Sequence, residues 1–348
     1  MAAALVYNRV PEAGLSIDHR SRVSPIAIYL LALATALMMG LRYEVGGDWY
    51  PYLLMYDLMQ LMSSDQLFGY FDPGYAVVGR LSDSLGLGIY GVNVICGIIM
   101  AFGIAYFCAR QPNPALTFLV GVPYLIIVVG MGYTRQGVAI GIIIAGIAGV
   151  SERTILRTIF IVFVAALFHK TALLVLPFIM APILRRNLLY AVIGGIVFVG
   201  MFYVLLAGSA DQMVTNYVDA GYESSGAVIR VLMNVIPALL ALLFRKRLGF
   251  NGYHSDMWSV FALVSLLLVP LVLVANFTTA IDRMALFLIP LQIAILPRIP
   301  YIFGHRRALN AQVFIAICGY SAMVQMVWIV FADNSRYWLP YRMAIFEL

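Results

Sequence analysis

A short polar stretch, residues 41–52, holds the first residue types in this sequence that suit chemistry. It reads Leu-Arg-Tyr-Glu-Val-Gly-Gly-Asp-Trp-Tyr-Pro-Tyr and combines a guanidinium, two carboxylates, adjacent glycines and four aromatic rings. Arginine is permanently charged and donates paired hydrogen bonds to phosphate oxygens. A carboxylate such as that of Asp48 can accept a proton, and Gly46-Gly47 permit a tight turn beside it. We interpret the stretch as the opening of a functional site on which later polar residues converge.

Three later apolar runs are each interrupted near the middle by polar residues, at 133–136, 169–170 and 276–283. Each interruption contains a cation. An arginine toward the centre of a bilayer costs about 2.5–3.5 kcal/mol on insertion scales, so it usually faces a cavity or a partner. Several arginines around a cavity suit a phosphate or pyrophosphate group. We therefore expect one hydrated cavity that collects Arg42, Arg80, Arg135, His169, Lys170 and Arg283.

Most of these residues also have a purely structural interpretation. Arg42 could simply extend to the interface from the end of the first span, and Arg135 could cap a helical hairpin. His169 could be a core histidine with satisfied ring nitrogens, and Arg283 could pair only with a neighbouring carboxylate. Tyr52 and the rings around it could stack on sugars or form an interfacial belt. The presence of a cation at three successive breaks on one side favours the site.

The composition indicates which elements must hold these residues. The chain has 348 residues, of which 63% are hydrophobic and only 11% are charged, and its mean hydropathy is +0.94. A soluble domain usually carries about 25% charged residues. Repeated apolar runs without strong period-two alternation predict an all-α polytopic membrane protein and not a membrane β-barrel. The three cysteines lie in apolar runs without paired spacing, which is typical of core residues.

The apolar runs predict about eleven transmembrane helices in a single domain, residues 1–348. The run 115–150 would make a helix of about 54 Å, longer than a bilayer core of about 30 Å, so we expect a helical hairpin. The segments assigned to the cytoplasm carry fourteen Lys/Arg and four Asp/Glu, against eight and twelve on the other side. This bias places the N-terminus in the cytoplasm and the C-terminus outside. Residues 42–88 are expected to form an extracytoplasmic loop with interfacial helices, and 208–227 a second loop.

The motifs resemble those of a known family, the EpsG family of exopolysaccharide proteins. Residues 42–52 resemble its R-x-x-V-G-x-D-x-x-x-Y opening, 133–139 its R-Q-x-x-A segment and 168–173 its F-H-x-[ST]-A-L segment. Arg283 fits an arginine of a late span, and residues 338–341 resemble a closing P-Y. The matches follow the family order over nearly the whole chain.

The resemblance implies a Wzy-like polysaccharide polymerase, a glycosyltransferase of the bacterial inner membrane. Such an enzyme transfers a growing glycan from undecaprenyl pyrophosphate to the next lipid-linked oligosaccharide repeat unit at the outer face. We expect a GT-C-like helical bundle with an outward-facing cavity. The expected partners are the undecaprenyl-pyrophosphate-linked oligosaccharide and the lipid bilayer, with a chain-length regulator and the export machinery as candidates.

The expected roles of the candidate residues follow from this reaction. Arg135 and Arg283, together with Arg42, would neutralise the charge on the leaving pyrophosphate. His169 would take the proton of the attacking sugar hydroxyl, with Asp48 as the second candidate base or only as a partner that orients Arg42. The remaining expected substrate contacts come from Arg80, Tyr52 and Lys170.

Two other functions fit the same residues. A flippase or exporter of lipid-linked oligosaccharides could bind the carrier headgroup with these cations, although no clear internal repeat supports a transporter. A membrane acyltransferase that modifies the exopolysaccharide could use His169 as its base. The sequence has no D-x-D, no H-E-x-x-H and no His/Cys cluster, so we expect no metal, no other cofactor and no nucleic-acid partner.

Overall fold

The computed structural model describes residues 24–151, 154–184, 188–206, 226–274, 278–305 and 308–347. Every regular element within these ranges is a helix, and the only β-type pairing there is a single bridge between Arg42 and Met343. The predicted all-α class is therefore confirmed. Most of the predicted loop 208–227 lies outside the described residues, as do several basic residues that were used for the topology (Arg9, Arg20, Arg22, Arg153, Arg185, Arg186, Arg306 and Arg307).

Five stretches of helix are long and apolar enough to cross a membrane. They cover Gly88–Cys108, Pro114–Gly132, Gly252–Val274, Thr278–Ile302 and Ala311–Phe331. Shorter apolar helices cover Pro25–Gly40, Thr134–Ile147, Leu156–Ala166, Lys170–Leu184 and Ala227–Leu243. These helices support a multi-pass membrane protein, while the number of eleven spans and the orientation of the termini stay predictions.

The N-terminal half begins with α1 (Pro25–Gly40), which packs along α5 (Gly88–Cys108), and α5 in turn packs along α8 (Thr134–Ile147). A methyl group on Gly103 would lie only 2.3 Å from the carbonyl oxygen of Gly141. Small residues therefore let the backbones of α5 and α8 approach closely, as is common between membrane helices. Along the chain, α1 and α5 are separated by three short helices, α2 (Trp49–Leu61), α3 (Ser64–Tyr70) and α4 (Pro73–Ser84).

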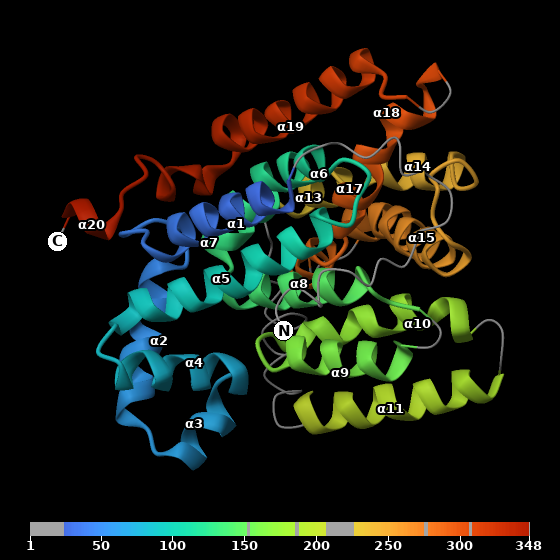
Figure 1. Ribbon diagram of the computed structural model, residues 1–348. Helices are drawn as coiled ribbons and strands as arrows, with labels where there is room; N and C mark the ends of the chain where they lie inside the picture. The colour runs from blue at the N-terminus through green and yellow to red at the C-terminus, as the bar shows by residue number, and fades with distance from the viewer. Residues whose placement is uncertain are drawn as a thin grey trace.

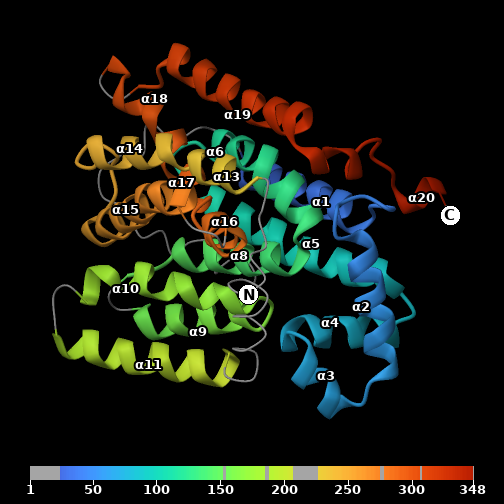
Figure 2. The same cartoon turned by 180° about the vertical axis from the view of Figure 1, so that it is seen from behind.

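The hairpin predicted for residues 115–150 is present and a second hairpin follows it, and the helices of both break where the polar residues stand. The first runs through α6 (Pro114–Gly121), the π-helix η3 (Val122–Val129) and α7 (Gly130–Gly132), and then continues as α8 after Tyr133. The second consists of α9 (Ile155–Ala166), the 3₁₀ helix η5 (Lys170–Val175) and α10 (Leu176–Leu184). Helix α11 (Leu188–Leu206) runs beside α9 and α10, and in both views this group lies on the face opposite α19 (Figures 1 and 2).

The C-terminal half completes the bundle. Its elements are α13 (Ala227–Leu232), α14 (Val235–Leu243), α15 (Gly252–Val274), α16 (Thr278–Leu286), α17 (Pro290–Ile295), η8 (Leu296–Arg298), α18 (Ile299–Ile302), α19 (Ala311–Phe331), η10 (Asp333–Tyr337) and α20 (Ala344–Glu347). A local signal sets the start of α19. The Asn310 side chain caps this helix by accepting a hydrogen bond from the Val313 backbone amide at 3.1 Å, as side-chain amides at N-caps do.

The loops gather at two ends of the bundle. At one end the C-terminal tail packs on the first polar stretch, where Arg342 pairs with Glu44 at 2.6 Å and the Gly46 amide donates to the Tyr337 carbonyl at 2.8 Å. At the other end Arg298 donates to Gln111 at 2.9 Å. The predicted outer and inner segments are thus separated, although the side that faces the cytoplasm stays a prediction.

Candidate functional site

Arg135 sits immediately after the break in the first hairpin. The backbone at Tyr133 leaves the helical region (φ −130°, ψ 56°), and α8 begins at the next residue. The Arg135 backbone amide donates to the Tyr52 hydroxyl at 3.3 Å, and its guanidinium donates to Asp72 at 2.7 Å. The break therefore presents Arg135 toward the short helices α2 and α4 and not toward lipid.

His169 occupies the turn of the second hairpin. Its backbone is extended (φ −156°, ψ 110°), and the preceding Leu167 carbonyl accepts a hydrogen bond from Gly74 at 2.8 Å. The imidazole stacks on Phe287 with ring centroids 6.4 Å apart. Its Nε2 atom is buried without a hydrogen-bond partner among the described residues, which leaves this nitrogen for a ligand.

Arg283 lies within α16, about one and a half turns after its first residue Thr278. The expectation of a cation at a hairpin turn is therefore corrected here, because the residue is helical. Its guanidinium stacks on the Tyr133 ring at 4.5 Å and donates to Gln136 at 3.4 Å. The Gln136 amide in turn donates to the Arg283 carbonyl at 2.7 Å, so both residues are held by the break that presents Arg135.

Asp48 is the last residue before α2 and is partly exposed. No hydrogen bond or ion pair joins its carboxylate to another residue of the described ranges, yet Arg283, Arg135 and Arg42 all attract its charge. Burial raises the pKa of Asp48, and the three guanidinium groups oppose that rise. Within the part of the chain that the structure describes, Asp48 is thus an unpaired carboxylate surrounded by three arginines.

The structure therefore brings together residues from five separate segments. Arg135 and Arg283 both act electrostatically on His169 and on Asp48, and Lys170 acts on Asp72. Burial raises the pKa of Asp72, and its ion pair with Arg135 opposes that rise. We call Asp48, Asp72, Arg135, His169, Lys170 and Arg283 the polar cluster.

Two of the predicted substrate-binding arginines have internal partners instead. Arg42 is fully buried and donates to the Met39 carbonyl and to Thr134, each at 3.0 Å. Arg80 donates to the carbonyl of Met62, the residue that follows the end of α2. Tyr52 is also buried and contacts the cluster through its hydroxyl. Contacts between these three residues and a substrate stay predictions.

Sequence reasoning missed several residues that support the cluster. Asp72 was assigned only to a loop, and its pairing with Arg135 spans 63 positions. Tyr133 and Gln136 were seen only as neighbours of Arg135 in the same motif. Arg230 forms an ion pair with Asp282 at 2.5 Å and donates to the Tyr133 hydroxyl at 2.9 Å. The polar character of residues 133–136 was the one available signal for this support.

A cavity of about 280 Å³ adjoins the cluster between η3, α13, α14 and α19. Tyr133 and Arg230 line it, but Arg135, His169 and Arg283 do not. Within the described ranges, no three His, Cys, Asp or Glu side chains are grouped so that they could hold a metal ion.

The comparisons with known proteins agree with the motifs. Neither the curated proteins nor the solved structures include a match to this chain. A family model described as EpsG family matches residues 26–343 and so covers all five segments that supply the polar cluster. The resemblance seen in the motifs is thereby confirmed, and the chain belongs to the EpsG family.

Proposed function

We propose that this protein is a polysaccharide polymerase that transfers a growing glycan from undecaprenyl pyrophosphate to the next lipid-linked repeat unit. Membership of the EpsG family supports an exopolysaccharide polymerase. The observation that carries the proposal is the convergence of Arg135, Arg283, His169 and Asp48, which come from far apart in the sequence. Two guanidinium groups beside an unpaired carboxylate suit a reaction that releases pyrophosphate and removes a proton.

In the proposed reaction the acceptor hydroxyl attacks the anomeric carbon of the growing glycan. A new carbon–oxygen bond forms, the bond to the pyrophosphate oxygen breaks, and the hydroxyl proton passes to a base. Arg135 and Arg283 stabilise the charge that develops on the pyrophosphate, because preorganised donors act strongly in a partly dry site. The pyrophosphate leaves on its lipid carrier.

The surroundings favour Asp48 over His169 as the base. Burial and two neighbouring guanidinium groups disfavour a charged imidazole at His169. Burial raises the pKa of Asp48, which strengthens it as a base, while the same arginines oppose that rise, and its carboxylate has no competing partner among the described residues. His169 then serves as a neutral group whose free Nε2 forms a hydrogen bond with the substrate.

This function places the protein in the bacterial inner membrane as a multi-pass enzyme with its site at the outer face. The long apolar helices support the membrane location. A chain-length regulator and the export machinery are the partners that such a reaction needs, because the polymer must be terminated and moved away.

Substitution of the two cluster arginines tests the proposal. We expect Arg135→Ala and Arg283→Ala each to lower polymer formation about a hundredfold or more, since loss of one preorganised charge-stabilising donor typically costs 10²–10³ in rate. Arg245→Ala is the matched control, because Arg245 is exposed and pairs with Asp256 at the opposite end of the bundle. Polymer is measured in cells that lack their own polymerase, with the amount of protein checked by immunoblot.

The location of the unpolymerised repeat units separates the alternatives. A lost polymerase leaves single lipid-linked units at the outer face, whereas a lost flippase leaves them at the inner face. Labelled acyl groups that reach the glycan only with the intact protein would indicate an acyltransferase. Normal polymer from both arginine variants would refute the proposed site.

A further inference from the structure

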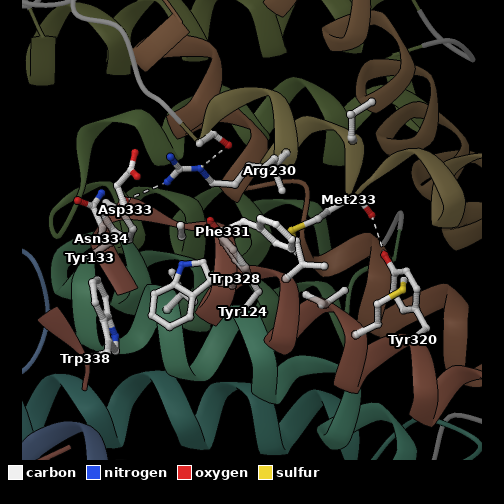
Figure 3. Close-up of a pocket in the computed structure, with 18 of the residues that line it drawn as sticks. Tyr124, Tyr133, Arg230, Met233, Tyr320, Trp328, Phe331, Asp333, Asn334 and Trp338 are labelled. Atoms are coloured by element: carbon white, nitrogen blue, oxygen red, sulfur yellow. Dashed lines mark hydrogen bonds between the residues drawn. The ribbon is translucent and has the colours of Figure 1, made fainter. Parts of the chain in front are cut away.

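The cavity beside the polar cluster has one polar end and an otherwise apolar wall. Arg230, Tyr133, Asp333 and Asn334 lie toward one end, while Met233 and Tyr320 lie toward the other (Figure 3). The apolar lining comes from α13, α14 and α19 and includes Ile229, Leu232, Ile236, Val324, Val327 and Phe331. A site of this shape suits an amphiphile and not a free sugar, because an apolar wall offers few hydrogen bonds.

The apolar wall reaches the outer surface of the bundle. Leu232, Ile236 and Met323 line the cavity, and these residues are 49%, 49% and 54% exposed. Only 11% of the residues in the most apolar stretch of α19 are buried against the rest of the protein. Because α19 is long and apolar enough to cross a membrane, the exposed edge of the cavity faces lipid, and a hydrocarbon chain could enter sideways.

The polar end of the cavity connects to the cluster through one ring. Tyr133 lines the cavity, and the guanidinium of Arg283 stacks on the same ring at 4.5 Å. Arg230 donates to the Tyr133 hydroxyl and pairs with Asp282, the neighbour of Arg283. The head of a molecule whose chain fills the cavity therefore lies at the polar end, where only the Tyr133 ring separates it from Arg283.

The wall beside this ring has an unusual backbone. Tyr124 and Val128 belong to the π-helix η3, a form that is rare and often found at functional sites. The Trp338 ring nitrogen donates to the carbonyl of Ile127 in the same π-helix at 3.0 Å. The C-terminal tail and the π-helix η3 thus hold each other in place at the polar end of the cavity.

From these features we infer that the cavity holds the isoprenoid chain of the lipid phosphate whose head lies at the polar cluster. The inference rests on the proposed function for the identity of the lipid. Methyl-branched isoprene units suit a wall rich in methionine, valine and isoleucine, since methionine adapts to irregular shapes. The volume of about 280 Å³ accommodates only part of a long chain, so the rest extends into the bilayer.

Photolabelling of the full chain in lipid nanodiscs tests the inference. The probe is a polyprenyl monophosphate with a diazirine on an isoprene unit near the phosphate. After irradiation and peptide mapping, we expect label on Met233 and Val324, and an excess of unlabelled polyprenyl phosphate should remove it. Label confined to outward-facing side chains of α19 would overturn the inference, as would equal competition by the same excess of phosphatidylglycerol.

Two variants of α19 provide a matched pair. Val324→Trp fills the cavity and should lower labelling at Met233 about tenfold, equivalent to about 1.4 kcal/mol of binding. Met326→Trp adds the same ring two residues away, where the side chain is 63% exposed and does not line the cavity, and it should label as the unchanged protein does. Equal labelling of both variants would contradict the inference.

The outcome is separable from that of the proposed function. Photolabelling requires no polymerisation, so label in the cavity together with normal polymer from Arg135→Ala and Arg283→Ala would refute the reaction site alone. Loss of polymer in those variants with no label in the cavity would refute the chain site alone.

Discussion

At the scale of single residues, the feature that distinguishes this site is a carboxylate left unpaired among arginines. Asp72 lies in the same cluster and is neutralised by Arg135 at 2.7 Å. Asp48 is attracted by three arginines but forms no ion pair with any of them within the described residues. The two carboxylates thus have different tasks: Asp72 holds Arg135 in place, and Asp48 remains free to accept a proton.

The raised pKa of Asp48 predicts how polymerisation depends on pH. Its carboxyl keeps a proton to a higher pH than the ordinary value of 3.8, so polymerisation should fall as pH falls through that raised pKa. Asp48→Asn should abolish polymerisation. His169→Gln should lower the rate of polymerisation but keep its fall at low pH (the acid limb of the pH profile). The measurement is the rate of polymer formation in detergent-solubilised membranes between pH 4 and 8, where the buffer reaches the outer face. An acid limb that disappears in His169→Gln would assign the base to His169.

The same shift has a consequence for stability. A carboxyl with a raised pKa binds its proton more tightly in the folded state, so the ionised form costs folding free energy at neutral pH, and that cost disappears as pH falls through the folded pKa. Asp48→Asn should therefore keep or raise the apparent Tm at pH 7. This separates its loss of activity from loss of folding.

At the scale of elements, one of the two adjacent glycines is required by geometry. Gly46 has φ +102°, and a methyl group there would lie 2.4 Å from the Met131 carbonyl oxygen. Gly47 lacks this restriction, because its methyl group would meet Trp338 at an ordinary 3.7 Å. Gly46→Ala should lower the stability by about 1–3 kcal/mol or more, and Gly47→Ala should change it little. Thermal unfolding of the purified protein measures both, and equal effects would contradict the assignment.

Arg42 connects the elements that carry the site. Its guanidinium bonds to residues of α1, α5, α7 and α8, namely Met39, Asn93, Gly130 and Thr134. Lysine cannot reproduce this planar fork, and each buried acceptor left without its donor costs about 1–3 kcal/mol. We expect Arg42→Lys to lower the apparent Tm clearly.

A second arginine provides the control for that substitution. Arg110 donates from its side chain to one carbonyl, that of Tyr106, so Arg110→Lys should change the apparent Tm little. If Arg42→Lys instead kept its Tm and lost only polymer formation, Arg42 would contact substrate directly, as the motif resemblance implies.

At the scale of the whole molecule, the two ends of the bundle should face different compartments. Arg336 lies in the tail that packs on the first polar stretch, and Lys246 lies at the opposite end; both are exposed. In intact cells whose outer membrane has been removed, a membrane-impermeant maleimide should label Arg336→Cys and not Lys246→Cys. Both variants should react after the inner membrane is permeabilised. The native Cys96 and Cys108 are buried, whereas Cys318 is partly exposed, so both variants also carry Cys318→Ser. Labelling of Lys246→Cys alone would reverse the orientation.

Much of the helix pattern could be predicted because its signals are local. The first span was expected to end at Arg42, and α1 covers Pro25–Gly40. The boundaries of a helix depend on its length and hydropathy and on proline and capping residues only a few positions away. The breaks near Tyr133 and His169 followed from runs too long for one crossing.

What the sequence by itself determined is therefore the helical class, the main apolar helices, the family and the segments that meet at the polar cluster. Only the tertiary structure decided the partner of each charge. It paired Arg135 with Asp72, buried Arg42 among carbonyl and hydroxyl oxygens, and left Asp48 without a partner in the described residues. The reason is physical: a span is set by residues next to one another, whereas an ion pair between positions 63 apart depends on how whole helices pack.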